Sequence, residues 1–75
     1  MSEKIPRLTV SEITKILEKH DFILTRQNGS HKIYKNGEGR RATVPFHSAK
    51  ILHPKVLESI MNEADLSVED LKKYL

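Results

Sequence analysis

The chain has 75 residues, of which 37% are hydrophobic and 31% charged, and its formal net charge is +3. Its length excludes two independently folded domains, so we expect residues 1–75 to form one domain, and the absence of cysteine excludes disulfides, thiolate metal sites and a cysteine nucleophile. No apolar run is long enough to span a membrane and the first residues lack the pattern of a secretory signal, so we expect a cytoplasmic protein without a membrane partner.

Basic residues concentrate in the middle of the chain. Between Arg26 and Lys55 there are seven basic residues and one acidic residue, whereas the rest of the chain has six basic and nine acidic residues. Basic groups gathered on one stretch favour contact with a polyanion such as a nucleic acid. A solvated, lysine-rich surface that only promotes solubility explains the same charges equally well, so both interpretations stay open here.

The first predicted element is a helix that begins at Val10. Thr9 and Glu12 have the spacing of a capping box, and apolar residues then recur at helical spacing up to Leu17. We expect the helix to stop around His20 and Asp21.

Three strands with short connections follow the helix. The expected ranges are 22–26, 30–35 and 40–45, with a hairpin signal at Asn28-Gly29 and a second turn at 36–39. In the third strand Ala42 and Val44 alternate with polar residues and should face the core. In the second strand we expect Tyr34 to point inward.

The last third of the chain predicts a loop and two helices. Residues 46–52 show no periodic pattern, and Pro54 suits the first position of an amphipathic helix that ends near Asp65. Ser67 and Asp70 resemble a second capping signal before a short third helix. The order of elements predicts an α+β fold, α-β-β-β-α, in which a three-stranded antiparallel meander carries both helices on one face and a short C-terminal helix follows.

The candidates for chemistry are histidines. His20 and His53 lie at predicted helix ends, where we expect structural roles, whereas His31 stands at an exposed strand start among basic residues. Such an imidazole suits proton transfer on RNA, whose own 2′-hydroxyl is the nucleophile, with cations stabilising the phosphate charge. An ordinary surface histidine is the simpler interpretation of these residue types. The spacing of the histidines and carboxylates predicts no metal site, and we expect no cofactor.

Several segments together resemble the HicA-type (YcfA-like) toxin family. They are Gly29-Ser30-His31 at a hairpin, the segment 41–47 (Arg-Ala-Thr-Val-Pro-Phe-His), and the helical residues 57–60 that lead to Ala64-Asp-Leu-Ser67. The resemblance covers roughly residues 8–75 and departs at Asp65, where the family commonly has glycine.

The resemblance implies a fold similar to a double-stranded-RNA-binding domain (dsRBD-like), cleavage of messenger RNA, and neutralisation by a HicB-like antitoxin that covers the active face. It assigns the catalytic role to His31, the turn to Gly29 and a phosphate contact to Ser30. His47 matches the end of the second segment, and its part in catalysis is open. The further residues expected to bind RNA are Lys32, Lys35, Arg40 and Arg41.

Three functions remain as hypotheses at this point. The first is an endoribonuclease toxin with His31 as general base or acid. The second is a noncatalytic RNA-binding module on the same basic sheet face, and the third is a protein-interaction domain that docks an acidic partner. The sequence predicts neither the cleavage preference nor the oligomeric state.

Overall fold

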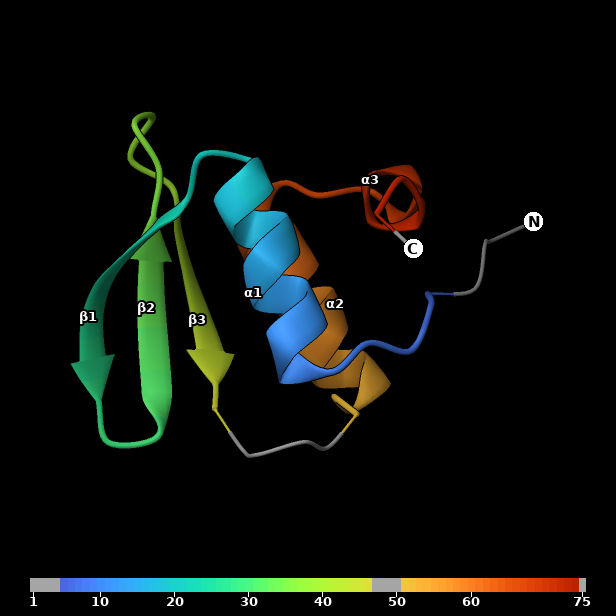
Figure 1. Ribbon diagram of the computed structural model, residues 1–75, viewed down its shortest axis with the longest axis horizontal. Coiled ribbons are helices and arrows are strands. Elements are labelled where there is room, and N and C mark those ends of the chain that lie inside the picture. Colours follow the sequence, from blue (N-terminus) through green and yellow to red (C-terminus); the bar gives the residue numbers. More distant parts are fainter. Residues whose placement is uncertain (1–4, 47–50, 75) are drawn as a thin grey trace.

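The computed structural model describes residues 5–46 and 51–74. The elements follow the order α1 (Val10–Lys19), β1 (Ile23–Asn28), β2 (His31–Lys35), β3 (Arg41–Pro45), α2 (Pro54–Ala64) and α3 (Val68–Lys72). The three strands form one antiparallel sheet in the order β1-β2-β3. Both α1 and α2 lie next to β3, and α3 lies beyond them (Figure 1). The predicted α+β order with its antiparallel meander is therefore confirmed.

Helix α1 begins and ends where the sequence predicts. Thr9 N–H donates to Glu12 Oε1 at 2.9 Å, and Glu12 N–H donates to Thr9 Oγ1 at 3.2 Å, which completes the predicted capping box. The helix buries one stripe against the sheet, consisting of Val10, Ile13, Ile16 and Leu17. After the C-cap at His20, Asp21 has a φ of 68°, and the chain turns into the sheet.

One face of the sheet packs against the helices and the other is open. Directly opposite residues of antiparallel strands point to the same face, and Tyr34 pairs with Ala42. Both side chains are buried, as is Val44, so the predictions for all three are confirmed. The first strand begins one residue later than predicted, and Phe22, just before it, is in the core.

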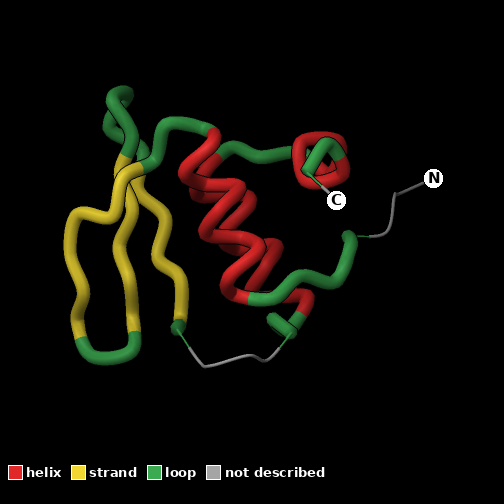
Figure 2. The backbone as a smooth tube through the Cα atoms, in the orientation of Figure 1, coloured by secondary structure: helices red, strands yellow, loops and turns green. Residues whose placement is uncertain are grey.

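The core is apolar throughout, and no polar or charged residue is buried within residues 5–46 and 51–74. Side chains from α1, from one face of the sheet and from α2 meet in it, and Leu66 and Leu71 extend it toward α3. Strand β1 differs from the other two strands because all six of its residues are exposed. In Figure 2 it is the strand farthest from the two long helices. β1 therefore depends on its pairing with β2.

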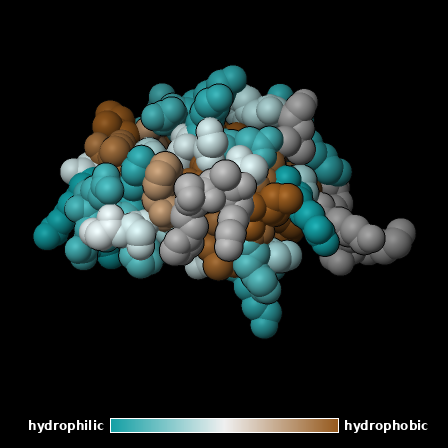
Figure 3. Space-filling view, turned by 60° about the horizontal axis from the view of Figure 1, so that its bottom comes forward, coloured by the Kyte–Doolittle hydropathy of each residue, from teal (hydrophilic) through white to brown (hydrophobic). Residues whose placement is uncertain are grey.

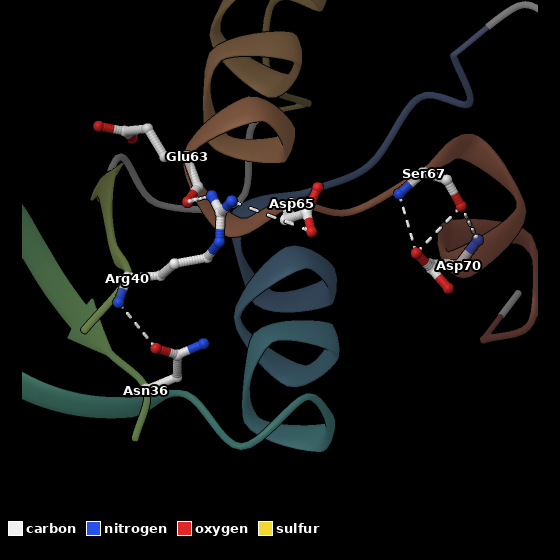
Figure 4. A network of polar contacts seen from close by, with 6 residues as sticks. All are labelled: Asn36, Arg40, Glu63, Asp65, Ser67 and Asp70. Atoms are coloured by element: carbon white, nitrogen blue, oxygen red, sulfur yellow. Dashed lines mark hydrogen bonds and ion pairs between the residues drawn. The ribbon is translucent and has the colours of Figure 1, made fainter. Parts of the chain in front are cut away.

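Helix α2 is held at both ends by local contacts. His53 is its N-cap, and its Nδ1 accepts from the Lys55 N–H at 3.1 Å, while Pro54 occupies the first turn as predicted. At the other end Asp65 is the C-cap in the left-handed region, with a φ of 57°. Arg40, from the turn before β3, donates to the Glu63 carbonyl at 3.1 Å and approaches the Asp65 carboxylate at 4.0 Å (Figure 4).

Helix α3 repeats the capping scheme of α1. Ser67 N–H donates to Asp70 Oδ2 at 2.9 Å, and Asp70 N–H donates to Ser67 Oγ at 3.1 Å (Figure 4). The Ser67 N–H and the Ser67 hydroxyl, which donates to the same Oδ2 at 3.0 Å, lower the pKa of the Asp70 carboxyl below its ordinary value. Leu71 anchors the helix in the core, and the Tyr74 ring meets the His20 ring edge-on, with centroids 5.6 Å apart.

Candidate functional site

A tight hairpin places His31 at the first position of β2. Asn28 and His31 are paired, so the two-residue loop consists of Gly29 and Ser30 and lies one residue later than the Asn28-Gly29 signal indicated. Gly29 has a φ of 62°, whereas Ser30 has no positive φ. A positive φ at only the first loop residue is typical of a type II′ turn, which favours glycine there. An added Cβ would meet no atom within 4 Å, so the backbone angle alone creates the preference for glycine.

The His31 side chain is exposed on the open face of the sheet. His31 pairs with Pro45, whereas the next pair, Lys32 and Val44, lies on the helix side, where Val44 is buried. No other described residue makes a hydrogen bond or ion pair with the His31 side chain. Its imidazole is therefore accessible to a ligand and not engaged in the fold.

Three cationic side chains share this open face with His31. Lys35 lies on the same side of β2, and Arg41 is directly opposite it on β3. Arg26, on β1, pairs with Ile33, which is also on the open face. All three residues are exposed, and we call the set of His31, Arg26, Lys35 and Arg41 the basic face.

Arg26 joins the basic face only because β1 contains a bulge. Phe22 is buried, and Leu24 pairs with the buried Tyr34, so regular alternation would put Arg26 on the helix side as well. The register shifts between Leu24 and Arg26, and the side chains after the shift exchange faces. The residue was therefore missed as a site candidate. Nothing in the local sequence signals this bulge.

Lys32 and Arg40 take other directions. Lys32 lies on the helix side of β2, where its Nζ is 3.8 Å from the centroid of the Phe46 ring. The guanidinium of Arg40 is directed to the C-terminal end of α2, through Glu63 and Asp65. The structure thus brings Lys35 and Arg41 onto the face of His31, while Lys32 and Arg40 are not on it. Gly29 and Ser30 form the adjoining loop, and His47 lies outside the described residues.

The two histidines expected to be structural are at helix ends. His20 closes α1 and His53 caps α2, so each has a place in the fold. Within residues 5–46 and 51–74, no group of three or more histidine or carboxylate side chains could hold a metal ion. The chemistry that the basic face itself offers is proton transfer by one imidazole on a surface that also carries three positive charges, with Lys35 and Arg41 at the other end of β2 from His31.

Comparison with known families places this geometry in context. Residues 10–66, which include all of α1, the sheet and α2, match the sequence model of a family described as the HicA toxin of bacterial toxin-antitoxin systems. The chain belongs to the HicA toxin family. A comparison with curated proteins found no match.

The match assigns a broad role and covers the basic face. A HicA toxin belongs to a toxin-antitoxin system, so the chain is a toxin with an antitoxin as its partner. The hairpin with His31 and the three cations of the basic face are inside the matched residues, whereas α3 follows them. No helix in the described part of this HicA chain has the length and apolar character that crossing a membrane requires.

Proposed function

We propose that this HicA-family toxin is an endoribonuclease that cleaves messenger RNA, with His31 as its catalytic residue. The observation that carries the proposal is the position of His31, which is exposed on a face that also presents Arg26, Lys35 and Arg41 and whose side chain is bonded to no residue in the described part of the chain. An RNA backbone on this face would have its phosphates near the cations and its ribose near the imidazole.

The proposed reaction uses the nucleophile of the RNA itself. The neutral imidazole of His31 removes the proton from a 2′-hydroxyl, and the 2′-oxygen attacks the adjacent phosphorus. The bond from phosphorus to the 5′-oxygen breaks, and that oxygen leaves with a proton from the imidazolium. The products are a 2′,3′-cyclic phosphate and a free 5′-hydroxyl. One positioned acid-base group typically contributes a rate factor of about 10² to 10⁴.

The cations and the loop have supporting roles in this proposal. Arg26, which pairs with Ile33, is the cation of the basic face nearest to His31 in register and stabilises the negative charge that grows on the phosphate oxygens in the transition state. Lys35 and Arg41, at the other end of β2, bind neighbouring phosphates of the same strand. Gly29 maintains the loop angle that presents His31, and Ser30 contacts a phosphate. Lys32 binds the RNA outside the basic face, and His47 is a further RNA contact. Arg40 was also expected to bind RNA, but its guanidinium contacts Glu63 and Asp65, so its share in binding is small.

The antitoxin would act by covering the basic face. We infer that a HicB-like antitoxin presents an acidic surface to Arg26, Lys35 and Arg41 and buries His31, because denying RNA access to the imidazole suffices for inhibition. RNA and antitoxin should then compete for the same surface of the toxin.

A His31→Ala variant tests the proposal. We expect the purified variant to cleave RNA at least about 100-fold more slowly than the wild type, because it lacks the acid-base group, while its RNA affinity is retained. His53→Asn is the matched control, since it removes an exposed histidine but retains a good N-cap for α2.

Three outcomes of this experiment would contradict the proposal. Undiminished cleavage by the His31→Ala variant would exclude His31 as the catalytic residue. RNA binding without cleavage by the wild type would favour the noncatalytic RNA-binding module. Absence of salt-sensitive RNA binding would favour the protein-interaction domain.

A further inference from the structure

Phe46 is an exposed aromatic residue at the end of the molecule that carries His31. Of the other aromatic side chains, Phe22 and Tyr34 are in the core, and the Tyr74 ring is covered in part by Lys19 and His20. Phe46 is 41% exposed. Hydrophobic residues also reach the surface in other areas of the face that Figure 3 shows, among hydrophilic ones.

Backbone contacts fix Phe46 beside the catalytic hairpin. Its N–H donates to the carbonyl of Ser30, and the preceding Pro45 is the pairing partner of His31. The ring lies near Lys32, on the helix side of the sheet, whereas His31 faces the open side. A single strand that bends around this end of the sheet could therefore contact both residues.

The ring and Lys32 together suit a nucleotide. The Lys32 ammonium is over the ring, 3.8 Å from its centroid, and so brings a positive charge next to an exposed π surface. Proteins that bind single-stranded nucleic acids combine such cations with aromatic rings on which bases stack. A base inside a duplex already has neighbours on both faces and offers no free face to a side chain.

We infer that Phe46 stacks on an unpaired base next to the scissile nucleotide and that the substrate is single-stranded RNA. This inference rests on the proposed function, because it takes His31 as the cleavage point. To the proposed function the inference adds Phe46 as a residue that selects the substrate, and it explains why duplex RNA should be a poor substrate. Phe46 is a positioning residue, since it holds a base beside the bond that His31 cleaves.

The test measures RNA binding in a background without cleavage. In the His31→Ala chain, Phe46→Ala should weaken the binding of a labelled single-stranded RNA about tenfold, the size expected for one lost stacking contact, and leave duplex binding unchanged. Phe46→Trp should retain affinity for the single strand, whereas Phe46→Leu, which keeps apolar bulk but has no π surface, should be as weak as Phe46→Ala. Tyr74→Leu is the control, because it alters an aromatic residue that directly follows α3, and α3 lies on the other side of the helices from the sheet (Figure 1).

Two results would overturn the inference. The first is that Phe46→Ala weakens the binding of single-stranded RNA and of duplex RNA equally. The second is that Phe46→Leu binds single-stranded RNA with wild-type affinity. Circular dichroism melting of each variant establishes that it is folded. The affinity measurement does not depend on cleavage, so the two proposals can fail separately. A His31→Ala chain that still cleaves RNA would refute the catalytic role of His31, whereas the affinities of the Phe46 variants decide whether Phe46 stacks on a base.

Discussion

At the scale of single residues, Asp65 shows how a local conformation limits stability. It ends α2 with a φ of 57°, a left-handed angle that glycine adopts without strain and that other residues adopt at a cost. Its carboxylate is 4.0 Å from the Arg40 guanidinium. Both groups are largely exposed, so this ion pair contributes little.

Replacing Asp65 with glycine and replacing it with alanine should therefore change the stability in opposite directions. We expect Asp65→Gly to raise the free energy of unfolding by about 0.5 kcal/mol, because relief of the backbone strain exceeds the loss of the ion pair. Asp65→Ala should lower it by about 1 kcal/mol, since alanine keeps the strain and loses the local polar contacts. Urea unfolding at neutral pH measures both. If Asp65→Gly were less stable than the wild type, the ion pair between Asp65 and Arg40 would stabilise the fold by more than the backbone strain at Asp65 destabilises it.

The exposure or burial of a single residue was predictable when it followed from its neighbours in sequence. The exposure of His31 followed from a hairpin motif next to it, and the burial of Tyr34 and Val44 followed from strand alternation. The face of the sheet on which Arg26 lies could not be predicted in this way, because it depends on a bulge that arises from pairing with β2. The direction of Arg40 depends on α2, which is more than ten residues away in sequence.

At the scale of elements, the helices were the most predictable because their signals are local. The capping boxes at Thr9 and Ser67 each join residues three apart, and the apolar stripes of α1 and α2 are regular. The strand ends were predicted to within two residues, and the largest difference is at the end of β1, which is Asn28 and not Arg26. The hairpin loop was displaced by one residue, since the register of the paired strands, and not the Asn-Gly pair alone, decides which residues turn.

The capping box of α3 should make the stability of the chain depend on acid. Hydrogen bonds from Ser67 lower the pKa of Asp70 below its ordinary value of 3.8, so the folded state favours the ionised carboxylate. This contribution to stability is complete above the unfolded-state pKa and is lost as the pH falls through the lower, folded-state pKa. We expect Ser67→Ala to move the Asp70 pKa only part of the way back toward 3.8 in an NMR titration, because the variant loses the hydroxyl hydrogen bond but keeps the larger effect of the Ser67 N–H. The loss of stability in acid should weaken accordingly.

A neighbouring carboxylate provides the control for this prediction. Glu69→Gln removes a negative charge from the same turn but leaves the hydrogen bonds between Ser67 and Asp70 intact. The Asp70 pKa in that variant should remain below 3.8. If Ser67→Ala leaves the Asp70 pKa where it is in the wild type, then the Ser67 hydroxyl does not contribute to the shift, and the Ser67 N–H, which the variant retains, accounts for it.

At the scale of the whole molecule, the topology separates the two faces of the sheet. The helices cover one face, and Glu63 of α2 also accepts the Thr43 N–H at 3.2 Å on the outer edge of β3. That contact helps to protect the edge strand from pairing with other chains. The opposite face stays open, and it presents cations from all three strands around His31. The concentration of basic residues in the middle of the sequence thus becomes a charged surface only after the strands pair.

Adjacent arginines on opposite sides of this division provide a sharp test of the basic face. Arg41 is on the open face, whereas the Arg40 guanidinium contacts Glu63 and Asp65. In the His31→Ala chain, Arg41→Gln should reduce the slope of log affinity for single-stranded RNA against log salt by about 0.7, the amount expected for one phosphate contact, and Arg40→Gln should reduce it by much less. The two variants remove the same charge one residue apart, so their net charges are equal and only the direction of the lost guanidinium differs. Equal changes of slope would show that RNA senses the overall charge of the toxin and that the basic face has no special part in binding.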